Sequence, residues 1–413
     1  MPTGSSLSDV SRYNQNVVIH AFRRRGPSSQ REIAQATGLS VATVSLIVRT
    51  LLSRGLLTEI RTEVLPRGRP RVIADLVASS RHAIGLHVDP SLMTAVLLDL
   101  KGSVVAEASS RDVDPEDPRS TMGRAAELAR EVGGAPSAGE GRIQGTGLAV
   151  PGPVDPVRES LVSPVWLPGW SGAPLSAMLR EHLDSPIPLI KDTLAAVIGE
   201  SWTRGGQALD STMVFLYVGT GTGIGLSNRG EPLGGASGNT GEVGAMLLAL
   251  DGDESSPESA LRNDPAKLVD QARRAGILTG PTEVVRSPHE VDLQFRALCR
   301  LARDGDRGAV DIVSAAAGRI ARVAAMAVDL VDADMLVFGG PYWELVSPWY
   351  LEAARRQLAQ RSAGGPHPVT VSGTVMDGDV GAVGAASAVL DRRFVPRPPG
   401  RGLPTSGGGP EEG

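Results

Sequence analysis

The stretch from Gln30 to Gly55, QREIAQATGLSVATVSLIVRTLLSRG, constrains the fold most because it has the pattern of two short helices joined by a tight turn. Gly38 supplies the corner, since a residue without a side chain takes up left-handed backbone angles at little cost. Ser40 is placed to cap the second helix by accepting a hydrogen bond from a free backbone N–H group. The pattern is typical of a DNA-binding helix-turn-helix, although an ordinary helical hairpin with Gly in its turn would share it.

The apolar residues of this stretch predict its buried faces. Ile33 and Ala34 are the inward positions of the first helix. In the second helix, apolar residues at three- and four-residue spacing predict one buried stripe, made of Val41, Val44, Val48, Leu51 and Leu52. The other side carries short groups near the helix start, which fits a major groove. The residues expected to contact DNA from the two helices are Gln30, Ser40, Ala42, Thr43, Ser45 and Arg49.

Two strands of a wing are expected next, at 57–65 and 71–76, with the loop PRGRPR between them. The glycine allows close approach to a groove, and the prolines hold the loop extended. Arginines on both sides of the glycine suit the negative potential of an A·T-rich minor groove. The loop alone could be a solvated linker, but its position after a helix-turn-helix favours insertion into DNA. The DNA contacts expected here are Arg67, Gly68, Arg69 and Arg71.

A further helix is predicted from Ser11 to Arg25, before the helix-turn-helix. Its inward positions are Val17, Val18, Ala21 and Phe22. The helix ends in three consecutive arginines, Arg23 to Arg25, which either contact phosphate or form a solvated helix end.

Charge divides the chain into a basic head and an acidic remainder. Residues 1–78 hold eleven Arg, no Lys and five acidic residues, a net charge of +6, whereas the whole chain of 413 residues carries −5. This distribution fits a head that meets phosphate and a body that does not. Aromatic residues are only 3% of the chain, which argues against stacking platforms for single-stranded nucleic acid.

Composition also bounds the class of protein. Hydrophobic residues make up 41% of the chain, which excludes wholesale disorder. The single cysteine, Cys299, excludes an internal disulfide. The sequence contains no run of about eighteen apolar residues and no hydrophobic signal core at its start, so we expect a soluble, cytoplasmic protein.

From His82 onward the sequence predicts an α/β body. Two hairpins, each followed by further strands and helices, suggest two similar halves around a cleft, although the first hairpin lacks the glycines of the second turn, GTGTG at 219–223. Strands are expected at 83–88, 94–100, 104–108, 143–150, 187–190, 213–218, 224–227 and 335–338, and helices at 120–132, 192–202, 309–331 and 379–390.

Residues 12–390 resemble the ROK family, which groups repressors and sugar kinases. The resemblance is carried, in order, by the winged helix with PRGRPR, by VPGPVD at 150–155 with SPVWLPGW at 163–170, by KDTLAAVIGE at 191–200, and by VGTGTGIG at 218–225 with GNTGEVG at 238–244. The winged head is a feature of the repressor branch, in whose recognition helices the position of Leu46 often carries a basic or polar residue. The resemblance implies an N-terminal winged helix-turn-helix, mainly α, and a two-lobed α/β body with an actin-like, hexokinase-like fold.

The same resemblance implies the domain boundaries. We expect a winged helix-turn-helix DNA-binding domain at 1–80, a ROK actin-like domain at 81–393, and a disordered tail at 394–413. Within the body, lobe one is expected at about 81–195 together with the C-terminal helix, and lobe two at about 196–378.

The nucleotide-binding strand departs from the family pattern. Kinases of the family cradle ATP phosphates with a strand followed by Asp, two Gly and Thr. The matching stretch is GLHVDPS at 85–91, in which His87 replaces the acid while Asp89 and Pro90 replace the glycines. Pro90 has no N–H group to offer, and a carboxylate here would repel a triphosphate. No nucleotide cofactor is therefore expected, and a degraded strand end is favoured over a catalytic role for His87 and Asp89.

The sugar site departs as well. The family's catalytic base lies in an Asn-Asp-x-Asn turn, which Asp192 matches as a vestigial base, with Lys191 and Leu194 in place of the two Asn. Lys191 either pairs with Asp192 or invites an acidic effector such as a sugar phosphate or sugar acid. Trp166 either closes the cleft or simply packs its lobe. The effector contacts expected from the resemblance are Trp166, Lys191, Asp192, Glu242 and Glu258.

No metal site is expected. The zinc site of many family members uses a His directly after Gly-Glu-x-Gly and a Cys-rich loop, because zinc prefers nitrogen and sulfur ligands. Ala245 takes the position of the His, and the segment 251–259 has no Cys.

Three functions compete. The first is a transcriptional regulator, a homodimer or homotetramer that binds an A·T-rich double-stranded operator and responds to a sugar or an acidic sugar derivative. The second is a sugar kinase with an added DNA-binding head, and the third is a dimerisation scaffold whose head binds DNA without an effector. The altered phosphate strand and the missing zinc ligands favour a regulator without enzymatic activity, and repression is the commoner behaviour in the family.

Overall fold

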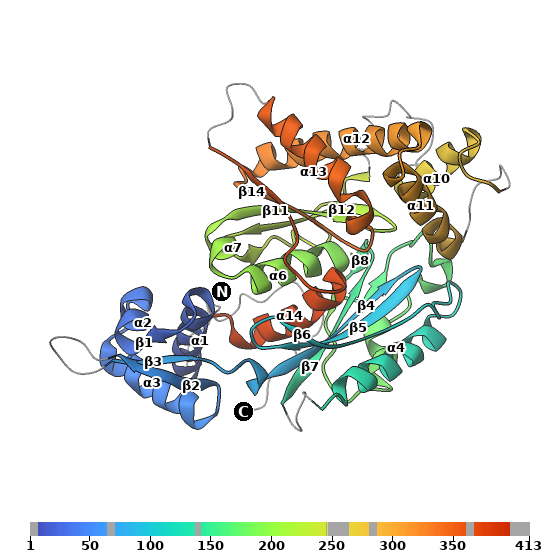
Figure 1. The fold of residues 1–413 in the computed structure, drawn as a ribbon. Helices are drawn as coiled ribbons and strands as arrows, with labels where there is room; N and C mark the ends of the chain where they lie inside the picture. The colour runs from blue at the N-terminus through green and yellow to red at the C-terminus, as the bar shows by residue number, and fades with distance from the viewer. Residues whose placement is uncertain are drawn as a thin grey trace.

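The computed structural model describes residues 7–63, 71–136, 142–244, 246, 264–280, 287–360 and 367–396. It consists of a small N-terminal head and a larger two-lobed body (Figure 1). Three groups of residues named above lie outside the described residues: the wing residues Arg67, Gly68 and Arg69, the positions Ala245 and Glu258, and the tail from 397 onward.

The head is the winged helix-turn-helix that the sequence predicts. Its helices are α1 (Leu7–Arg25), α2 (Gln30–Thr37) and α3 (Val41–Ser53). A small antiparallel sheet lies beside them, with the strand order β1 (Ser28–Ser29), β3 (Arg71–Leu76) and β2 (Leu57–Glu63).

Local capping residues fix the two short helices. Gly38 ends α2 in the left-handed region, at φ 70°, and its N–H donates to the carbonyl of Ala34 at 3.0 Å. The hydroxyl of Ser40 accepts the N–H of Thr43 at 3.1 Å and so begins α3. Both assignments were expected. The sequence reasoning missed Ser29, whose side chain forms a reciprocal capping box with Glu32 at the start of α2.

The buried stripe of α3 differs from the expectation. The buried residues are Val44, Ile47, Val48 and Leu51, whereas Val41 is 54% exposed and Leu52 is half-buried. A helical side chain leans over the turn that precedes it, and Val41, as the first residue of α3, has no such turn. The prediction was therefore wrong for Val41 and Leu52, and it missed Ile47.

The body contains two sheets with the same topology, which confirms the predicted two similar halves. In each sheet a three-stranded antiparallel meander is followed by two parallel strands. The first sheet has the order β6 (Val104–Ser110), β5 (Leu92–Asp99), β4 (His82–Asp89), β7 (Ile143–Val150), β10 (Leu189–Lys191). The second has the order β13 (Glu231–Pro232), β12 (Thr222–Asn228), β11 (Thr212–Val218), β14 (Met335–Gly339), β15 (Thr370–Gly373).

Two helices, α6 (Asp192–Arg204) and α14 (Val380–Phe394), pack against each other between the sheets (Figure 1). Outside the sheets lie α4 (Pro118–Gly133) on the first, and α12 (Arg307–Val331) and α13 (Trp343–Ala359) on the second, followed by α10 (Asp264–Arg274) and α11 (Pro288–Arg303). The shorter elements are η1 (Ala78–Ser80), β8 (Val154–Asp155), β9 (Ser160–Leu161), η2 (Pro168–Trp170), α5 (Leu175–Arg180) and α7 (Gly206–Asp210).

Glycines allow α14 to lie directly on its neighbours, as its small residues predict. A Cβ atom on Gly85 of β4 would come within 1.9 Å of the carbonyl oxygen of Ala382. A Cβ on Gly384 would come within 2.1 Å of the carbonyl oxygen of Ala195 on α6. These contacts are with backbone, which cannot swing aside, so the packing of α14 on β4 and α6 requires glycine at both positions.

The end of α1 attaches the head to the body. Arg23 stacks on the ring of Trp202, with its Cζ 3.3 Å from the ring centroid, and donates to the Trp202 carbonyl at 2.9 Å. Arg24 forms an ion pair with Asp210. Burial lowers the pKa of Arg23 to about 9, with Asp391 opposing the shift. Both expectations for this run, phosphate contact and a solvated end, were therefore wrong for Arg23, because the body provides an aromatic ring and a carbonyl. Arg24 stays exposed beside Asp210, as a solvated helix end predicts.

Among the described helices, none is by itself both long and apolar enough to cross a membrane. The pair of α2 and α3 satisfies length and composition jointly, but it is bent by 119° at the turn.

Candidate nucleic-acid interface and interlobe site

The solvent side of α3 presents one continuous face. Ala42, Leu46 and Arg49 are exposed and Ser45 is half-buried, at the spacing of one helix face. We call these four residues the reading face. It contains three of the predicted DNA contacts, together with Leu46, which was not among them and whose side chain is 63% exposed.

The other predicted helix contacts lie at helix starts. Gln30 is half-buried as the first residue of α2. The hydroxyl oxygens of Ser40 and Thr43 lie 2.8 Å apart, so each has the other as a hydrogen-bond partner. This contact helps to shape the start of α3, and the contacts of Ser40, Thr43 and the reading face with bases stay predictions.

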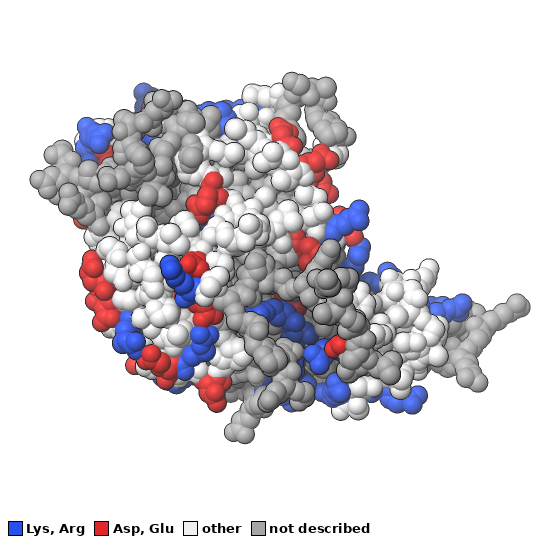
Figure 2. Space-filling model, turned by 180° about the vertical axis from the view of Figure 1, so that it is seen from behind, with Lys and Arg blue, Asp and Glu red and all other residues white. Residues whose placement is uncertain are grey.

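The wing is built by β2 and β3, which pair antiparallel with Glu63 opposite Arg71. Arg71 is half-buried at the start of β3, next to the loop that joins the two strands. The tip residues Arg67, Gly68 and Arg69 lie outside the described residues, so their contact with a minor groove stays a prediction. Figure 2 shows basic side chains predominating on the head and acidic side chains spread over the body.

In the body, the turns of the two hairpins are joined by one carboxylate. Asp89, at the end of β4, is buried and accepts the N–H and hydroxyl of Ser91 at 3.0 and 2.9 Å. Its second oxygen accepts the hydroxyl of Thr220, in the glycine turn of the other lobe, at 2.8 Å. Burial raises the pKa of Asp89, against the opposing effect of His87. In the first turn, therefore, the N–H of Ser91 is already hydrogen-bonded, and Pro90 has no N–H.

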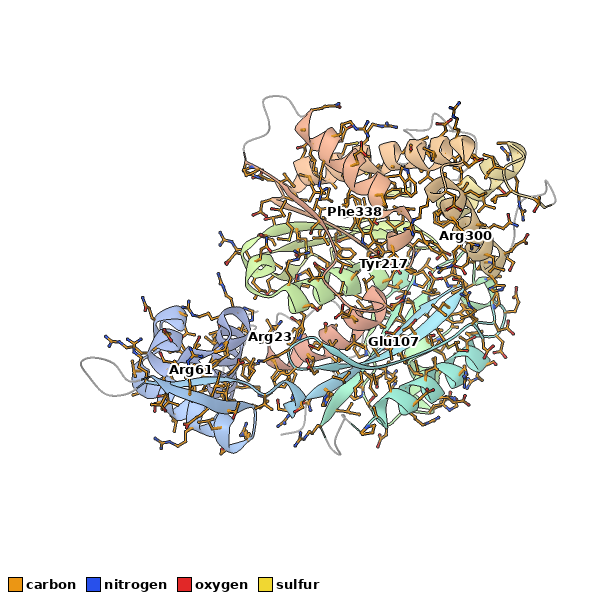
Figure 3. All side chains as sticks on the ribbon, in the orientation of Figure 1. Arg23, Arg61, Glu107, Tyr217, Arg300 and Phe338 are labelled. Carbon is orange, nitrogen blue, oxygen red and sulfur yellow. The ribbon has the colours of Figure 1, made fainter. Side chains whose placement is uncertain are left out.

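His87 lies behind this turn in a buried network. Its Nδ1 is 2.8 Å from a carboxylate oxygen of Asp379, the cap residue of α14, and its Nε2 is 3.4 Å from the hydroxyl of Tyr217 on β11. Figure 3 shows Tyr217 in the interior of the body. Burial opposes protonation of His87, but the charge and hydrogen bond of Asp379, together with the charges of Asp89 and Asp192, outweigh it and raise the pKa to about 9. Burial by itself would raise the pKa of Asp379. The charge and hydrogen bond of His87, together with hydrogen bonds from the backbone, outweigh this effect and lower the pKa. His87 and Asp89 each have a hydrogen-bond partner in the second lobe, Tyr217 and Thr220, and the expectation that this strand end is degraded for nucleotide binding stays a prediction.

The predicted effector residues are partly brought together. The ammonium group of Lys191 lies 2.5 Å from a carboxylate oxygen of Glu242 and donates to the carbonyl of Thr240 at 3.2 Å. The side chain of Lys191 is only 3% exposed, whereas that of Glu242 is 52% exposed. Lys191 therefore forms its ion pair with Glu242 and not with Asp192, because Glu242 reaches it from the second lobe.

Asp192 lies at the start of α6, buried, and accepts the N–H of Thr193 at 2.6 Å. Burial raises its pKa to about 6, with His87 and Lys191 opposing. Trp166 is half-buried and packs against the hydrophobic core of the second lobe, and both roles considered for it, closing a cleft and packing, stay predictions. Its indole N–H is buried and has no hydrogen-bond partner among the described residues.

Sequence reasoning missed three residues of this site: Tyr217, Asp379 and Asn239. Asn239 makes two hydrogen bonds with the backbone of Val154, both of 2.7 Å, and so ties the two lobes together. Asp379 was recognisable as an Asp that precedes a helix, but its bond to His87 spans the chain. In the described residues no group of His, Cys, Asp and Glu has an arrangement that could hold a metal ion.

The geometry defines a class of protein. A winged helix-turn-helix is joined to a two-lobed α/β body whose two sheets repeat the same topology on either side of α6 and α14. The chain belongs to the ROK family, which it matches over residues 84–392, and residues 17–60 match the IclR helix-turn-helix domain.

Regulators are among the relatives. The chain is 25% identical to the xylose repressor of Bacillus subtilis over 248 residues, 60% of this chain and 63% of the repressor. It is 23% identical to the DNA-binding transcriptional dual regulator NagC of Escherichia coli over 342 residues, 81% of this chain and 82% of NagC. The chain spans about six-tenths of the length of the first curated relatives that it matches.

Solved structures show the same fold. The ROK family transcriptional regulator described as a homolog of the E. coli MLC protein has a TM-score of 0.67 at 18% identity, covering 94% of this chain and 98% of that one. Structures of a ROK hexokinase and a ROK glucokinase cover 74% of this chain, with TM-scores of 0.54 and 0.59. The regulator match includes the head, whereas the kinase matches cover the body's share of the chain.

Proposed function

We propose that this chain is a DNA-binding transcriptional regulator that acts as a repressor. In this proposal residues 1–80 bind DNA, and residues 81–393 form the oligomer and bind an effector. The observation that carries the proposal is the winged helix-turn-helix, with an exposed reading face on α3, attached to a ROK body. Relatives of the chain bear the names of a repressor and a DNA-binding regulator, which supports the proposal.

In this mechanism two heads of a homodimer or homotetramer place their α3 helices in successive major grooves, about one helical turn apart. The wings, through Arg67 and Arg69, enter adjacent A·T-rich minor groove, where negative potential is enhanced. Closure of the body around an effector changes the spacing of the heads. A coupling of about 1–3 kcal/mol is enough for regulation.

We infer that the body does not act as a kinase. Pro90 lacks an N–H group, and the N–H of Ser91 already bonds to Asp89. The carboxylate of Asp89 faces Thr220 at the junction of the two hairpin turns, where a phosphate would meet its negative charge. A coupled assay with common hexoses and ATP is expected to show no turnover. Turnover that disappears in Asp192→Asn would instead support the alternative, a sugar kinase with a DNA-binding head.

An acidic effector would compete with Glu242 for the ammonium group of Lys191. The ammonium group of Lys191 is held by the half-exposed carboxylate of Glu242, and an effector carboxylate or phosphate can replace that partner. A thermal-shift screen with sugars, sugar phosphates and sugar acids is expected to raise the melting temperature for one class, since a ligand of the native state stabilises it by mass action. An unchanged melting temperature with every class would favour the scaffold alternative.

The DNA proposal is tested by footprinting on the chain's own upstream region, followed by duplex titration. Thr43→Ala is expected to reduce discrimination between sites, because Thr43 helps shape the start of the reading helix. Arg69→Ala is expected to weaken binding to all duplexes. The slope of log affinity against log salt concentration should become shallower by about 1, the contribution of one phosphate contact. Arg158→Ala, an exposed arginine on the body, is the charge-matched control and should bind like the unaltered chain.

A further inference from the structure

The centre of the reading face is a leucine in contact with solvent. Leu46 is 63% exposed and lies one turn after Ala42 and one turn before Arg49. Val41, at the start of the same helix, is 54% exposed. Exposed aliphatic side chains such as these gain free energy when another surface covers them.

Charge identifies that surface. The first 78 residues carry a net charge of +6, and Arg49 extends the reading face with a cation. A strongly basic module whose helix face is exposed beside a two-stranded wing is complementary to a DNA duplex. The occupant that fits both the charge and the shape is therefore the major groove.

Chemistry then limits what Leu46 can recognise. Its side chain has no donor or acceptor, so it cannot read the polar edges of guanine, adenine or cytosine. The one aliphatic group that the four standard base pairs present in the major groove is the 5-methyl group of thymine. On the basis of the proposed function, we infer that Leu46 is a specificity-determining residue that packs on a thymine methyl group in each half-site.

The test begins with selection of duplexes from a random library by the full chain. Each thymine in the selected half-site is then replaced by deoxyuridine, which removes the methyl group and leaves base pairing unchanged. We expect one position at which this replacement weakens binding about fourfold per half-site, the equivalent of one buried methyl group.

The variant Leu46→Ala should lose this methyl dependence and bind the thymine and deoxyuridine duplexes equally. Leu46 is exposed, and Ala favours helix, so the variant should fold normally. Leu293→Ala, at a similarly exposed leucine on α11, should keep the full methyl dependence. Leu46→Met, which keeps an aliphatic surface, should restore most of it.

Two results would overturn the inference. Either no thymine in the selected site is sensitive to deoxyuridine, or Leu46→Ala keeps the same sensitivity as the unaltered chain. Failure to select any duplex is a different result, since it would remove the proposed DNA-binding function together with this inference.

Discussion

His87 and Asp379 bring opposite charges together in the interior, between β4 and the start of α14. Their side chains are 1% and 10% exposed, so water screens the pair little. The folded protein therefore keeps a proton on His87 up to a pKa of about 9, against 6.5 for an unperturbed histidine. A protonated imidazole at neutral pH is thus part of the native interlobe contact.

This difference predicts a loss of stability in alkaline solution. Because the pKa of His87 is higher in the folded than in the unfolded protein, protonation of His87 stabilises the fold. This contribution is fully present below pH 6.5 and is lost as the pH rises through about 9. The loss should be on the order of 3 kcal/mol, measured as the free energy of unfolding in denaturant at pH 6 and pH 10. His87→Gln should lack this part of the pH dependence, and an equal alkaline loss in that variant would contradict the assignment.

A second residue-scale prediction concerns the start of the reading helix. Ser40→Ala removes the acceptor for the N–H of Thr43 and should cost about 1 kcal/mol of stability. Ser45→Ala, in the body of the same helix, should cost nothing or slightly stabilise. Urea denaturation of both variants makes the comparison, and equal destabilisation would count against the capping role of Ser40.

Residue roles were predictable from the sequence where they depend on neighbours along the chain. Gly38 and Ser40 were assigned correctly because turn and cap chemistry is local. The partner of Lys191 was not, since Glu242 lies 51 residues further on and only the folded lobes bring the two charges together. Trp202 was likewise invisible as the partner of Arg23, because the contact joins two domains.

At the scale of elements, most helices and strands were predictable because hydrophobic spacing and Gly or Pro punctuation mark them. The strand at 143–150 and the long helix ending at Val331 have the expected limits or nearly so. The equal topology of the two sheets was only suggested by the hairpins, since strand order depends on contacts between distant segments. The helix α14 runs to Phe394, four residues beyond the predicted end.

The contact between α14 and α6 gives the element-scale prediction. Gly384→Ala would place a Cβ 2.1 Å from the carbonyl oxygen of Ala195, so the helices must separate, at a cost of about 3 kcal/mol or more. Gly123→Ala on α4, where the added Cβ would lie 3.8 Å from His182 Nε2, should instead stabilise by up to about 1 kcal/mol. Thermal unfolding distinguishes the two, and a tolerated Gly384→Ala would contradict the close packing.

At the scale of the whole molecule, α6 connects the interlobe site to the head. Asp192 begins this helix beside Lys191, and Trp202, near its end, carries the stacked Arg23. Figure 3 shows Arg23 where the head meets the body. We propose that this helix couples the candidate effector site at one end to the head at the other.

Loosening this junction should separate the stabilities of head and body. Arg23→Ala removes a desolvated cation–π contact and a hydrogen bond, which should cost about 2 kcal/mol. We expect the head to unfold in an earlier, separate calorimetric transition. Arg25→Ala, at the exposed end of the same helix, is the control and should leave the transition unchanged. An unchanged transition in Arg23→Ala would show that the stack does not hold the head.

The most direct test of the regulator is a fluorescence anisotropy titration of the full chain with its footprinted duplex and with a scrambled duplex, over a series of salt concentrations. We predict binding to the footprinted site at least about a thousandfold tighter than to the scrambled duplex. We also predict that affinity falls steeply as salt rises, because arginines of the head displace counterions. Equal affinity for the two duplexes, or no binding at low salt, would contradict the account.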